Sequence, residues 1–241
     1  MKKNILLTGA SKGIGKEIAK ELGDNYNVFL TSRNEELLKK VSEQINAKDY
    51  CICDLTQQQD LEKLSKFIKD NSIDILINNA GEYIYGEIEK MSHENISKIF
   101  TANLLAPTYL CSKSVGTMKA KKWGRIINIG SISGVMGEAN ASVYSSSKSG
   151  LIGLTKALAL ELAQYNITVN TINPGWVETE LGLKSIEESE LSLSETLETI
   201  PQKRFVNPKE VANLVEYLIS DNAKGITGQS INLCAGLSLG I

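Results

Sequence analysis

Histidine and cysteine are scarce in this chain of 241 residues, which contains one histidine and four cysteines. No two cysteines form a C-x-x-C pair, and His93 alone cannot complete a zinc site with them. Cys51 and Cys53 would point to the same face of a strand, where buried packing is a simpler expectation than redox chemistry. We therefore expect no metal site, and the low cysteine content fits a reducing compartment.

An excess of charge of one sign and long apolar runs are also missing. The chain has 26 basic and 28 acidic residues, dispersed along its length, so it lacks the basic footprint of a nucleic-acid binder. No run approaches the roughly 18 apolar residues that a membrane helix needs. The apolar start ends at Thr8, which is too early for a signal peptide. We expect a cytoplasmic protein without nucleic-acid or membrane partners.

Short apolar runs alternate with longer segments of helical periodicity along the whole chain. Near-continuous apolar strands indicate a parallel sheet that is covered on both faces. This pattern predicts an α/β fold, with residues 1–241 forming a single Rossmann-type doubly wound domain around a seven-stranded parallel sheet. The predicted strands are 5–8, 28–31, 50–53, 75–78, 125–129, 168–173 and 230–233. The predicted helices are 13–22, 35–46, 57–69, 93–117, 142–165 and 208–220.

A glycine-rich turn follows the first predicted strand and leads into a helix. Three glycines let backbone amides approach a pyrophosphate, and the helix N-terminus adds a partial positive charge. The spacing is G-x-x-x-G-x-G rather than the commoner G-x-G-x-x-G. A plain tight turn is the alternative, but the position after the first strand favours cofactor binding. The predicted contacts are Gly9, Ser11, Lys12, Gly13, Ile14 and Gly15.

The end of the second predicted strand indicates which nicotinamide cofactor is bound. An NAD enzyme usually has a carboxylate here for the ribose hydroxyls, whereas this chain has Ser32 and Arg33. Arg33 can bind a 2′-phosphate with its planar donors, and Lys12 can reach the same group. Solvated surface charges are the alternative. We expect NADPH/NADP as the cofactor, with Asp54 and the following Leu55 near the adenine.

Tyr144 and Lys148 lie four residues apart in a helical segment, which places both side chains on one face. A neighbouring ammonium favours the phenolate and is expected to lower the pKa of Tyr144 from about 10 toward neutrality. Tyr144 can then exchange a proton with a ketone or an alcohol. Ser131 follows a predicted strand and can bond the same oxygen. A tyrosine and a lysine at this spacing are common, so this inference depends on the other motifs.

Taken together, these motifs resemble the short-chain dehydrogenase/reductase family in their order and spacing, across essentially the whole chain. The resemblance implies that Tyr144 protonates the substrate oxygen, that Lys148 holds the nicotinamide ribose, and that Asn103 positions a water. It also implies further cofactor contacts. The segments that carry it are residues 8–15 and 78–81, Asn103, Ser131, Tyr144, Lys148, and Pro174 with Gly175. The implied catalytic residues are Asn103, Ser131, Tyr144 and Lys148, and the further cofactor contacts are Asn79, Ala80, Gly81, Pro174, Gly175, Val177 and Thr179.

Within the family, residues 124–131, 151–154, 166–170 and 231–237 most resemble 3-oxoacyl-acyl-carrier-protein reductases and related ketoreductases. This likeness implies a 3-oxoacyl thioester substrate and a role in fatty acid biosynthesis. Carrier-protein reductases typically have a basic residue where this chain has Tyr165, although Arg125, Lys121 and Lys122 retain the other half of a basic patch. Glutamates at 187, 188 and 190 would repel an acidic carrier. The substrate carrier is therefore either coenzyme A or an acyl-carrier protein.

Residues 176–205 interrupt the last strand–helix alternation, at the carboxyl ends of the strands where open α/β sheets bind ligands. We expect this segment to form a lid with an apolar side that closes over an acyl chain. Its apolar side chains are Leu181, Leu183, Ile186, Leu191, Leu193 and Leu197. The predicted substrate contacts are Ser131, Tyr144, Met136 and Trp176, with Tyr83 and Tyr85 as further apolar wall. A surface excursion without function is the alternative.

Residues 102–115 and 151–162 are apolar over more of their surface than one sheet face needs. With the tail 231–241, they fit the homotetramer that the resemblance implies, although a wide core-facing stripe is the alternative. Two other functions stay open. The same residues would serve a dehydrogenase or reductase of a small alcohol, polyol or steroid. A regulator that senses NADPH without turnover is less consistent with an intact Tyr144 and Lys148.

Overall fold

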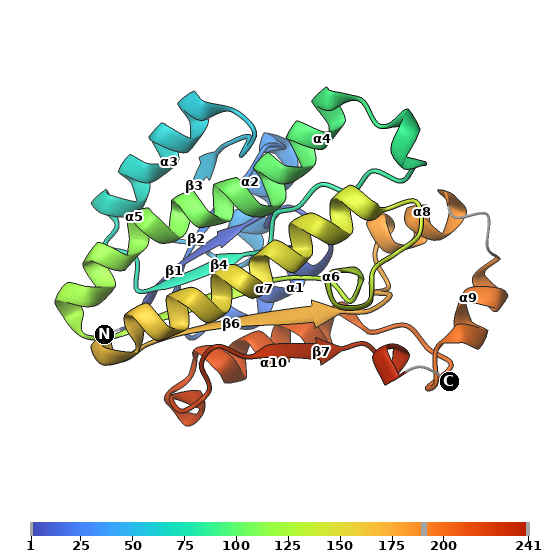
Figure 1. Cartoon of the computed structure of the whole chain (residues 1–241). Coiled ribbons are helices and arrows are strands. Elements are labelled where there is room, and N and C mark those ends of the chain that lie inside the picture. Colours follow the sequence, from blue (N-terminus) through green and yellow to red (C-terminus); the bar gives the residue numbers. More distant parts are fainter. Residues whose placement is uncertain (1, 189–191, 240–241) are drawn as a thin grey trace.

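The computed structural model describes residues 2–188 and 192–239 and contains a seven-stranded parallel sheet (Figure 1). The strand order is β3-β2-β1-β4-β5-β6-β7, so the direction of winding reverses between β1 and β4. This is the predicted α/β fold, and the fold class is confirmed. The strands are β1 (Asn4–Thr8), β2 (Asn27–Ser32), β3 (Asp49–Ile52), β4 (Ile75–Asn78), β5 (Gly124–Ile129), β6 (Ile167–Pro174) and β7 (Ser230–Leu233).

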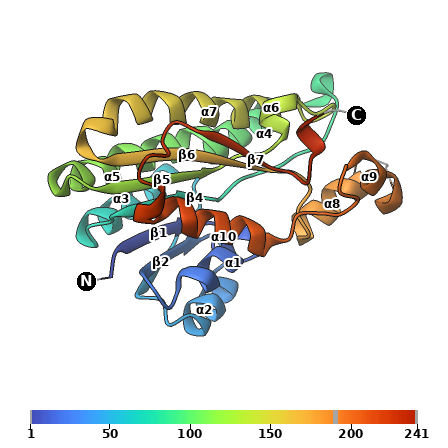
Figure 2. The same ribbon diagram turned by 90° about the horizontal axis from the view of Figure 1, so that it is seen from below.

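Helices cover both faces of the sheet, in two layers that Figure 2 shows edge-on. Helices α1, α2 and α10 lie on one face, and α3, α4, α5 and α7 lie on the other. The α-helices are α1 (Gly13–Leu22), α2 (Glu35–Gln44), α3 (Gln58–Asp70), α4 (His93–Phe100), α5 (Ala106–Lys121), α6 (Ser133–Met136), α7 (Ser142–Leu162), α8 (Glu180–Glu188), α9 (Leu193–Thr199) and α10 (Pro208–Ile219). Short 3-10 turns are η1 (Ile88–Lys90), η3 (Ala163–Tyr165), η4 (Asp221–Ala223) and η5 (Leu237–Leu239).

The apolar core follows from the alternation of side chains along the central strands. In β1, Ile5 and Leu7 belong to the cluster under α1 and α10, whereas Leu6 belongs to the cluster on the opposite face. All three side chains are fully buried. Because both faces are covered, these strands contain no polar face, which is why they were recognisable as continuous apolar runs.

The segment 93–117 differs from the single helix that its periodicity predicts. The structure has α4, then a π-helical turn over Thr101–Leu105, then α5. Pro107 lies at the start of α5 and has no backbone N–H to donate four residues back. A π-turn accommodates this interruption, and such turns often occur at functional sites. It places Asn103 in the middle of the irregular turn.

The four cysteines are buried and unpaired, as expected for packing residues. Burial raises the pKa of Cys53 and Cys111 to about 12, so both stay as unreactive thiols at neutral pH. Within residues 2–188 and 192–239, no three histidine, cysteine or acidic side chains gather as a metal site. The same residues include no helix with the length and apolar character to cross a bilayer.

Candidate active site

The turn between β1 and α1 depends on its glycines. Gly9 and Gly13 have φ angles of +66° and +54°, in the left-handed region that side chains disfavour. A Cβ on Gly15 would lie 2.2 Å from the carbonyl oxygen of Gly9, so only glycine fits there. At these glycines no side chain covers the backbone of the turn, which lies at the carboxyl edge of the sheet, as a phosphate-binding turn requires.

Asn79, just after β4, stabilises the glycine-rich turn between β1 and α1 by hydrogen bonds. Its side-chain amide donates to the carbonyl oxygens of Thr8 (2.9 Å) and Gly9 (3.1 Å). The backbone N–H groups of Asn79 and Ala80 both donate to the Thr8 hydroxyl at 3.0 Å. These four bonds join β1 to β4 at the point where the winding of the sheet reverses, which is where doubly wound folds bind dinucleotides.

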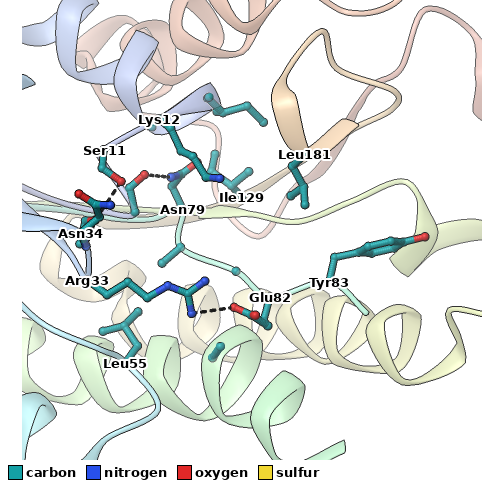
Figure 3. A pocket seen from close by; sticks show the side chains of 18 of the residues that line it. Ser11, Lys12, Arg33, Asn34, Leu55, Asn79, Glu82, Tyr83, Ile129 and Leu181 are labelled. Atoms are coloured by element: carbon teal, nitrogen blue, oxygen red, sulfur yellow. Dashed lines mark hydrogen bonds and ion pairs between the residues drawn. The ribbon is translucent and has the colours of Figure 1, made fainter. Parts of the chain in front are cut away.

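A cavity of about 600 Å³ opens at this edge of the sheet (Figure 3). Three predicted cofactor residues, Pro174, Gly175 and Val177, line a neighbouring cavity instead. The predicted cofactor residues that line the large cavity are Gly9, Ser11, Lys12, Gly13, Ile14, Gly15, Ser32, Arg33, Asp54, Leu55, Asn79, Ala80, Gly81, Tyr144, Lys148 and Thr179.

Both basic side chains that were predicted to meet a 2′-phosphate lie in this cavity, and each is paired with a glutamate. Arg33 lies 3.2 Å from Glu82, which is also 2.9 Å from Lys98 (Figure 3). Lys12 lies 3.2 Å from Glu180. Glu82 was not predicted, although it directly follows residues 78–81. A bound 2′-phosphate would therefore compete with Glu82 for Arg33.

Asp54 lines the same cavity. Its Oδ1 accepts bonds from the backbone N–H (2.9 Å) and the hydroxyl (2.8 Å) of Thr56. Burial alone would raise the pKa of Asp54, but these bonds and the charges of Arg33 and Lys98 outweigh it and lower the pKa. Asp54 is thus an ionised acceptor that can face an amino group.

Tyr144 and Lys148 project from one face of α7, but the predicted effect of the lysine on the tyrosine is wrong for this arrangement. The Lys148 Nζ lies 5.7 Å from the ring centroid of Tyr144 and donates to the carbonyl oxygen of Ile129 at 2.9 Å. Burial raises the pKa of Tyr144 to about 12, against a smaller lowering by its hydrogen bond with Ser131. Burial also lowers the pKa of Lys148 to about 8. Desolvation is therefore the main cause of both pKa shifts here.

Asn103 is fully buried, and its amide is engaged on both sides. Its Oδ1 accepts from the backbone N–H of Glu82 (2.7 Å), and its Nδ2 donates to the carbonyl of Glu82 (2.9 Å) and to Ser147 (3.0 Å). A Cβ added to Gly81 would lie 3.2 Å from Asn103 Oδ1 and 3.4 Å from Lys148 Nζ. Asn103 and Lys148 therefore converge beside Gly81, under the cofactor cavity.

A second cavity, of about 240 Å³, lies beside the first and has Tyr144 in the wall that the two share. The four predicted substrate residues, Ser131, Tyr144, Met136 and Trp176, all line it. Tyr83 lines both cavities, whereas Tyr85 lines neither of these two.

Two further residues of this second cavity, Ser133 and Glu138, were not predicted. Ser133 begins α6 and Glu138 follows it, both between Ser131 and Tyr144, and their polarity was the only sequence feature that could have indicated a role in the site.

The segment 176–205 forms two short helices beside the second cavity. Leu181 and Ser185 of α8 line this cavity, and Ile186 is buried. Leu183 and Leu193 are exposed, so the predicted apolar side is only partly turned inward. A bridge between Val177 and Val206 closes the base of the segment. Leu191 and Glu190 lie outside the described residues.

The predicted basic patch for a carrier protein is wrong in one of its members. The Arg125 side chain is fully buried, and its guanidinium lies 3.1 Å from Asp221 and 4.4 Å above the ring of Trp123. Lys121 is paired with Asp74 at 2.6 Å. Arg125 is the second residue of β5, at the opposite end of this strand from Ser131. It therefore stabilises the fold and cannot meet a partner.

Residues 3–190 match the family model described as short chain dehydrogenase. A 3-oxoacyl-(acyl-carrier-protein) reductase from Buchnera aphidicola is 38% identical over 98% of this chain and 97% of its own. Two solved structures superpose with a TM-score of 0.93. One is an actinorhodin polyketide ketoreductase variant with NADPH, 35% identical over 98% of this chain and 97% of that chain. The other is an NADPH-dependent reductase involved in bacilysin biosynthesis, 29% identical over the whole of both chains.

Proposed function

The chain belongs to the short-chain dehydrogenase family, as its motifs predicted, and on this basis we propose that it reduces a ketone to a secondary alcohol with NADPH. One observation carries the proposal. Tyr144 stands in the wall between a 600 Å³ cavity lined by the glycine turn and a 240 Å³ cavity lined by Ser131. A proton donor at that boundary can reach a substrate that lies against a cofactor.

The residues of the larger cavity fit a dinucleotide phosphate. The bare turn around Gly9 and Gly13 offers backbone amides to a pyrophosphate, and Arg33 with Lys12 offers cationic donors to a 2′-phosphate. Ser32, in place of a carboxylate, leaves room for that phosphate. NADPH, when bound, supplies a hydride.

Tyr144 acts as the acid in this reaction. Because burial raises its pKa to about 12, Tyr144 holds its proton at neutral pH and can donate it to the oxygen of a ketone as negative charge develops there. Ser131 lies with Tyr144 in the wall of the smaller cavity, and it lowers the pKa of Tyr144 by less than burial raises it. In our proposal, Lys148 turns from the Ile129 carbonyl to a ribose hydroxyl, and Asn103 anchors the segment that begins at Glu82.

The substrate that we propose is a 3-oxoacyl thioester, as in the relatives named for ketoacyl reduction. Met136, Trp176 and Leu181 give the smaller cavity an apolar wall that suits an acyl chain, with the segment 176–205 as its lid. Coenzyme A is the favoured carrier. Tyr165 supplies no positive charge, and the burial of Arg125 removes one of the three basic side chains of the patch that an acidic carrier protein would need.

Steady-state assays with acetoacetyl-CoA, acetoacetyl-carrier protein and a panel of simple ketones test this assignment. We expect acetoacetyl-CoA to be reduced at least as efficiently as the carrier-protein thioester. Reduction of a steroid or sugar-like ketone with no turnover of either thioester would replace the substrate and leave the reaction class intact. A role in fatty acid biosynthesis and a cytoplasmic location depend on the thioester assignment.

We further propose a homotetramer that uses the faces of α5 and α7. Leu105, just before α5, is 58% exposed, and Leu160 on α7 is 84% exposed. Exposed leucines on neighbouring helices favour contact with another subunit. Light scattering at micromolar concentration should give four times the mass of the chain, and a monomer mass would contradict the proposal.

A further inference from the structure

Two cationic side chains, Arg33 and Lys98, share the carboxylate of Glu82 beside the larger cavity. The Arg33 guanidinium lies 3.2 Å from Glu82 Oε2, a pair that Figure 3 shows, and the Lys98 Nζ lies 2.9 Å from Glu82 Oε1. Arg33 and Glu82 line this cavity, whereas Lys98, in the last turn of α4, lines neither of the two cavities. Because the two cations use different oxygens, Arg33 can leave Glu82 without disturbing the pair with Lys98.

The position of Glu82 is fixed from the backbone. Asn103 accepts from the N–H of Glu82 at 2.7 Å and donates to its carbonyl oxygen at 2.9 Å, and Asn103 is itself fully buried. The Glu82 side chain is only 16% exposed, so little water can replace a lost partner. Removal of one partner from a poorly solvated ion pair is costly, because it leaves the other charge uncompensated.

The two other carboxylates that line the larger cavity are in a different situation. Asp54 accepts two hydrogen bonds from Thr56. Glu180 pairs with Lys12, but its side chain is 79% exposed, so water solvates it when Lys12 leaves. Among the described residues of this wall, Glu82 is therefore the carboxylate that needs a second cation once its first partner is withdrawn.

We propose that Lys98 is a positioning residue for NADPH, which retains Glu82 and thereby frees Arg33 to bind the 2′-phosphate. This inference rests on the proposed role of Arg33 in cofactor binding. A phosphate monoester carries about −1.5 to −2 charges at neutral pH and draws Arg33 away from Glu82. Lys98 then remains as the partner of Glu82, so no unpaired carboxylate faces the bound phosphate. NADH has a hydroxyl at this position, leaves the Arg33–Glu82 pair intact and gains nothing from Lys98.

Two simpler roles for Lys98 lead to different expectations. A cation near the C-terminus of α4 stabilises the helix by itself, and a loss of that kind would affect both cofactors equally. A cation that attracted the phosphate directly would act whether or not residue 82 is charged. The proposed role alone requires both the 2′-phosphate and the Glu82 carboxylate.

Equilibrium binding tests the inference without a ketone. Calorimetry gives the Kd for 2′,5′-ADP and for 5′-AMP, which differ in the 2′-phosphate, and fluorescence titration gives the Kd for NADPH and NADH. The variants are Lys98→Met, Lys98→Arg, Glu82→Gln and the double variant Lys98→Met/Glu82→Gln. The matched control is Lys90→Met, because Lys90 pairs with Glu87 on the surface, outside both cavities. Thermal unfolding verifies that each variant folds.

We expect Lys98→Met to raise the Kd for NADPH and for 2′,5′-ADP about fourfold, as for loss of one partly exposed ion pair. The Kd for NADH and for 5′-AMP should stay unchanged. Lys98→Arg should bind all four ligands like the unmodified protein, because it retains the charge. Glu82→Gln should lower the Kd for 2′,5′-ADP, and adding Lys98→Met to it should cause no further change, because both substitutions act on one pair.

Three results would overturn the inference and leave the proposed ketone reduction intact. They are an unchanged Kd for NADPH in Lys98→Met, an equal rise for NADPH and NADH, and a loss that persists in the Glu82→Gln background. Unchanged binding of 2′,5′-ADP by Arg33→Ala would overturn the role of Arg33, and this inference with it. Absence of ketone reduction would overturn the proposed reaction alone, since none of these measurements uses a ketone.

Discussion

The two cavities that meet at Tyr144 are built in different ways. The larger one is formed by the first turns after β1, β2 and β4, where glycines and backbone amides face the space. The smaller one is formed by side chains from the β5–α7 loop and from the segment after β6. Backbone geometry leaves a fixed sequence pattern, whereas a wall of side chains can change at every position. The larger cavity therefore leaves the clearer pattern in the sequence.

Tyr144 lies in the wall that the two cavities share, so its replacement should lower kcat more than any other change. Tyr144→Phe keeps the ring that packs on Tyr83 but removes the proton. We expect kcat to fall by roughly 10²–10⁴-fold while the Kd for NADPH stays unchanged. The control is Tyr85→Phe, because Tyr85 lines neither cavity. Substantial turnover by folded Tyr144→Phe would remove Tyr144 from its role as the acid.

A substitution in the larger cavity should change the preference between NADPH and NADH and leave KM for the ketone unchanged. Arg33→Ala removes one charge-assisted phosphate contact, so the ratio of kcat/KM for NADPH over NADH should fall about tenfold. The matched control is Lys40→Ala, whose pair with Glu36 lies on the exposed face of α2. An unchanged ratio in Arg33→Ala would show that the 2′-phosphate is recognised elsewhere.

Glu82 would compete with the 2′-phosphate for Arg33, so neutralising Glu82 should strengthen the preference for NADPH. Glu82→Gln releases Arg33 and Lys98 from their ion pairs but keeps the backbone contacts of Glu82 with Asn103. We expect KM for NADPH to fall by a few-fold and KM for NADH to stay constant, measured by initial rates. Equal changes for the two cofactors would mean that Glu82 acts on the site as a whole.

A change confined to the substrate side should have the smallest effect. Met136 lines the smaller cavity and is 54% exposed, so Met136→Ala trims the apolar wall with little risk to the fold. Loss of about one methylene of contact, roughly 0.8 kcal/mol, would raise KM for the ketone about fourfold. The control is Val135→Ala, which lines neither cavity. A change in the Kd for NADPH in Met136→Ala, with KM for the ketone constant, would show that the two cavities do not act separately.

The sequence predicted the sheet, the glycine turn and the placement of Tyr144 and Lys148 on one helix face because each depends on a local pattern. Apolar strands, Gly9 to Gly15 and the spacing of Tyr144 and Lys148 are all visible along the chain. The raised pKa of Tyr144 was not predictable, because desolvation depends on how much of the fold surrounds the ring.

Two other features depend on partners that are distant in the sequence. Arg125 was predicted to belong to a surface patch, but its side chain is buried, and its partner Asp221 lies 96 residues further along the chain. Glu82 pairs with Arg33 across 49 residues. Contacts of this kind are set by tertiary packing, which local patterns do not encode. The same holds for the exposed Leu183 and Leu193 on the predicted inner side of the lid.

The most direct test of the central claim is the stoichiometry of the reaction with a 3-oxoacyl thioester. The unmodified protein is mixed with NADPH and acetoacetyl-CoA, and the loss of NADPH absorbance is compared with the secondary alcohol recovered by mass spectrometry. We predict one alcohol for each NADPH consumed, and both product formation and NADPH consumption slowed by roughly 10²–10⁴-fold with Tyr144→Phe. Binding of NADPH without its consumption, with this thioester and with every ketone of the panel, would contradict the account and indicate a protein that senses the cofactor.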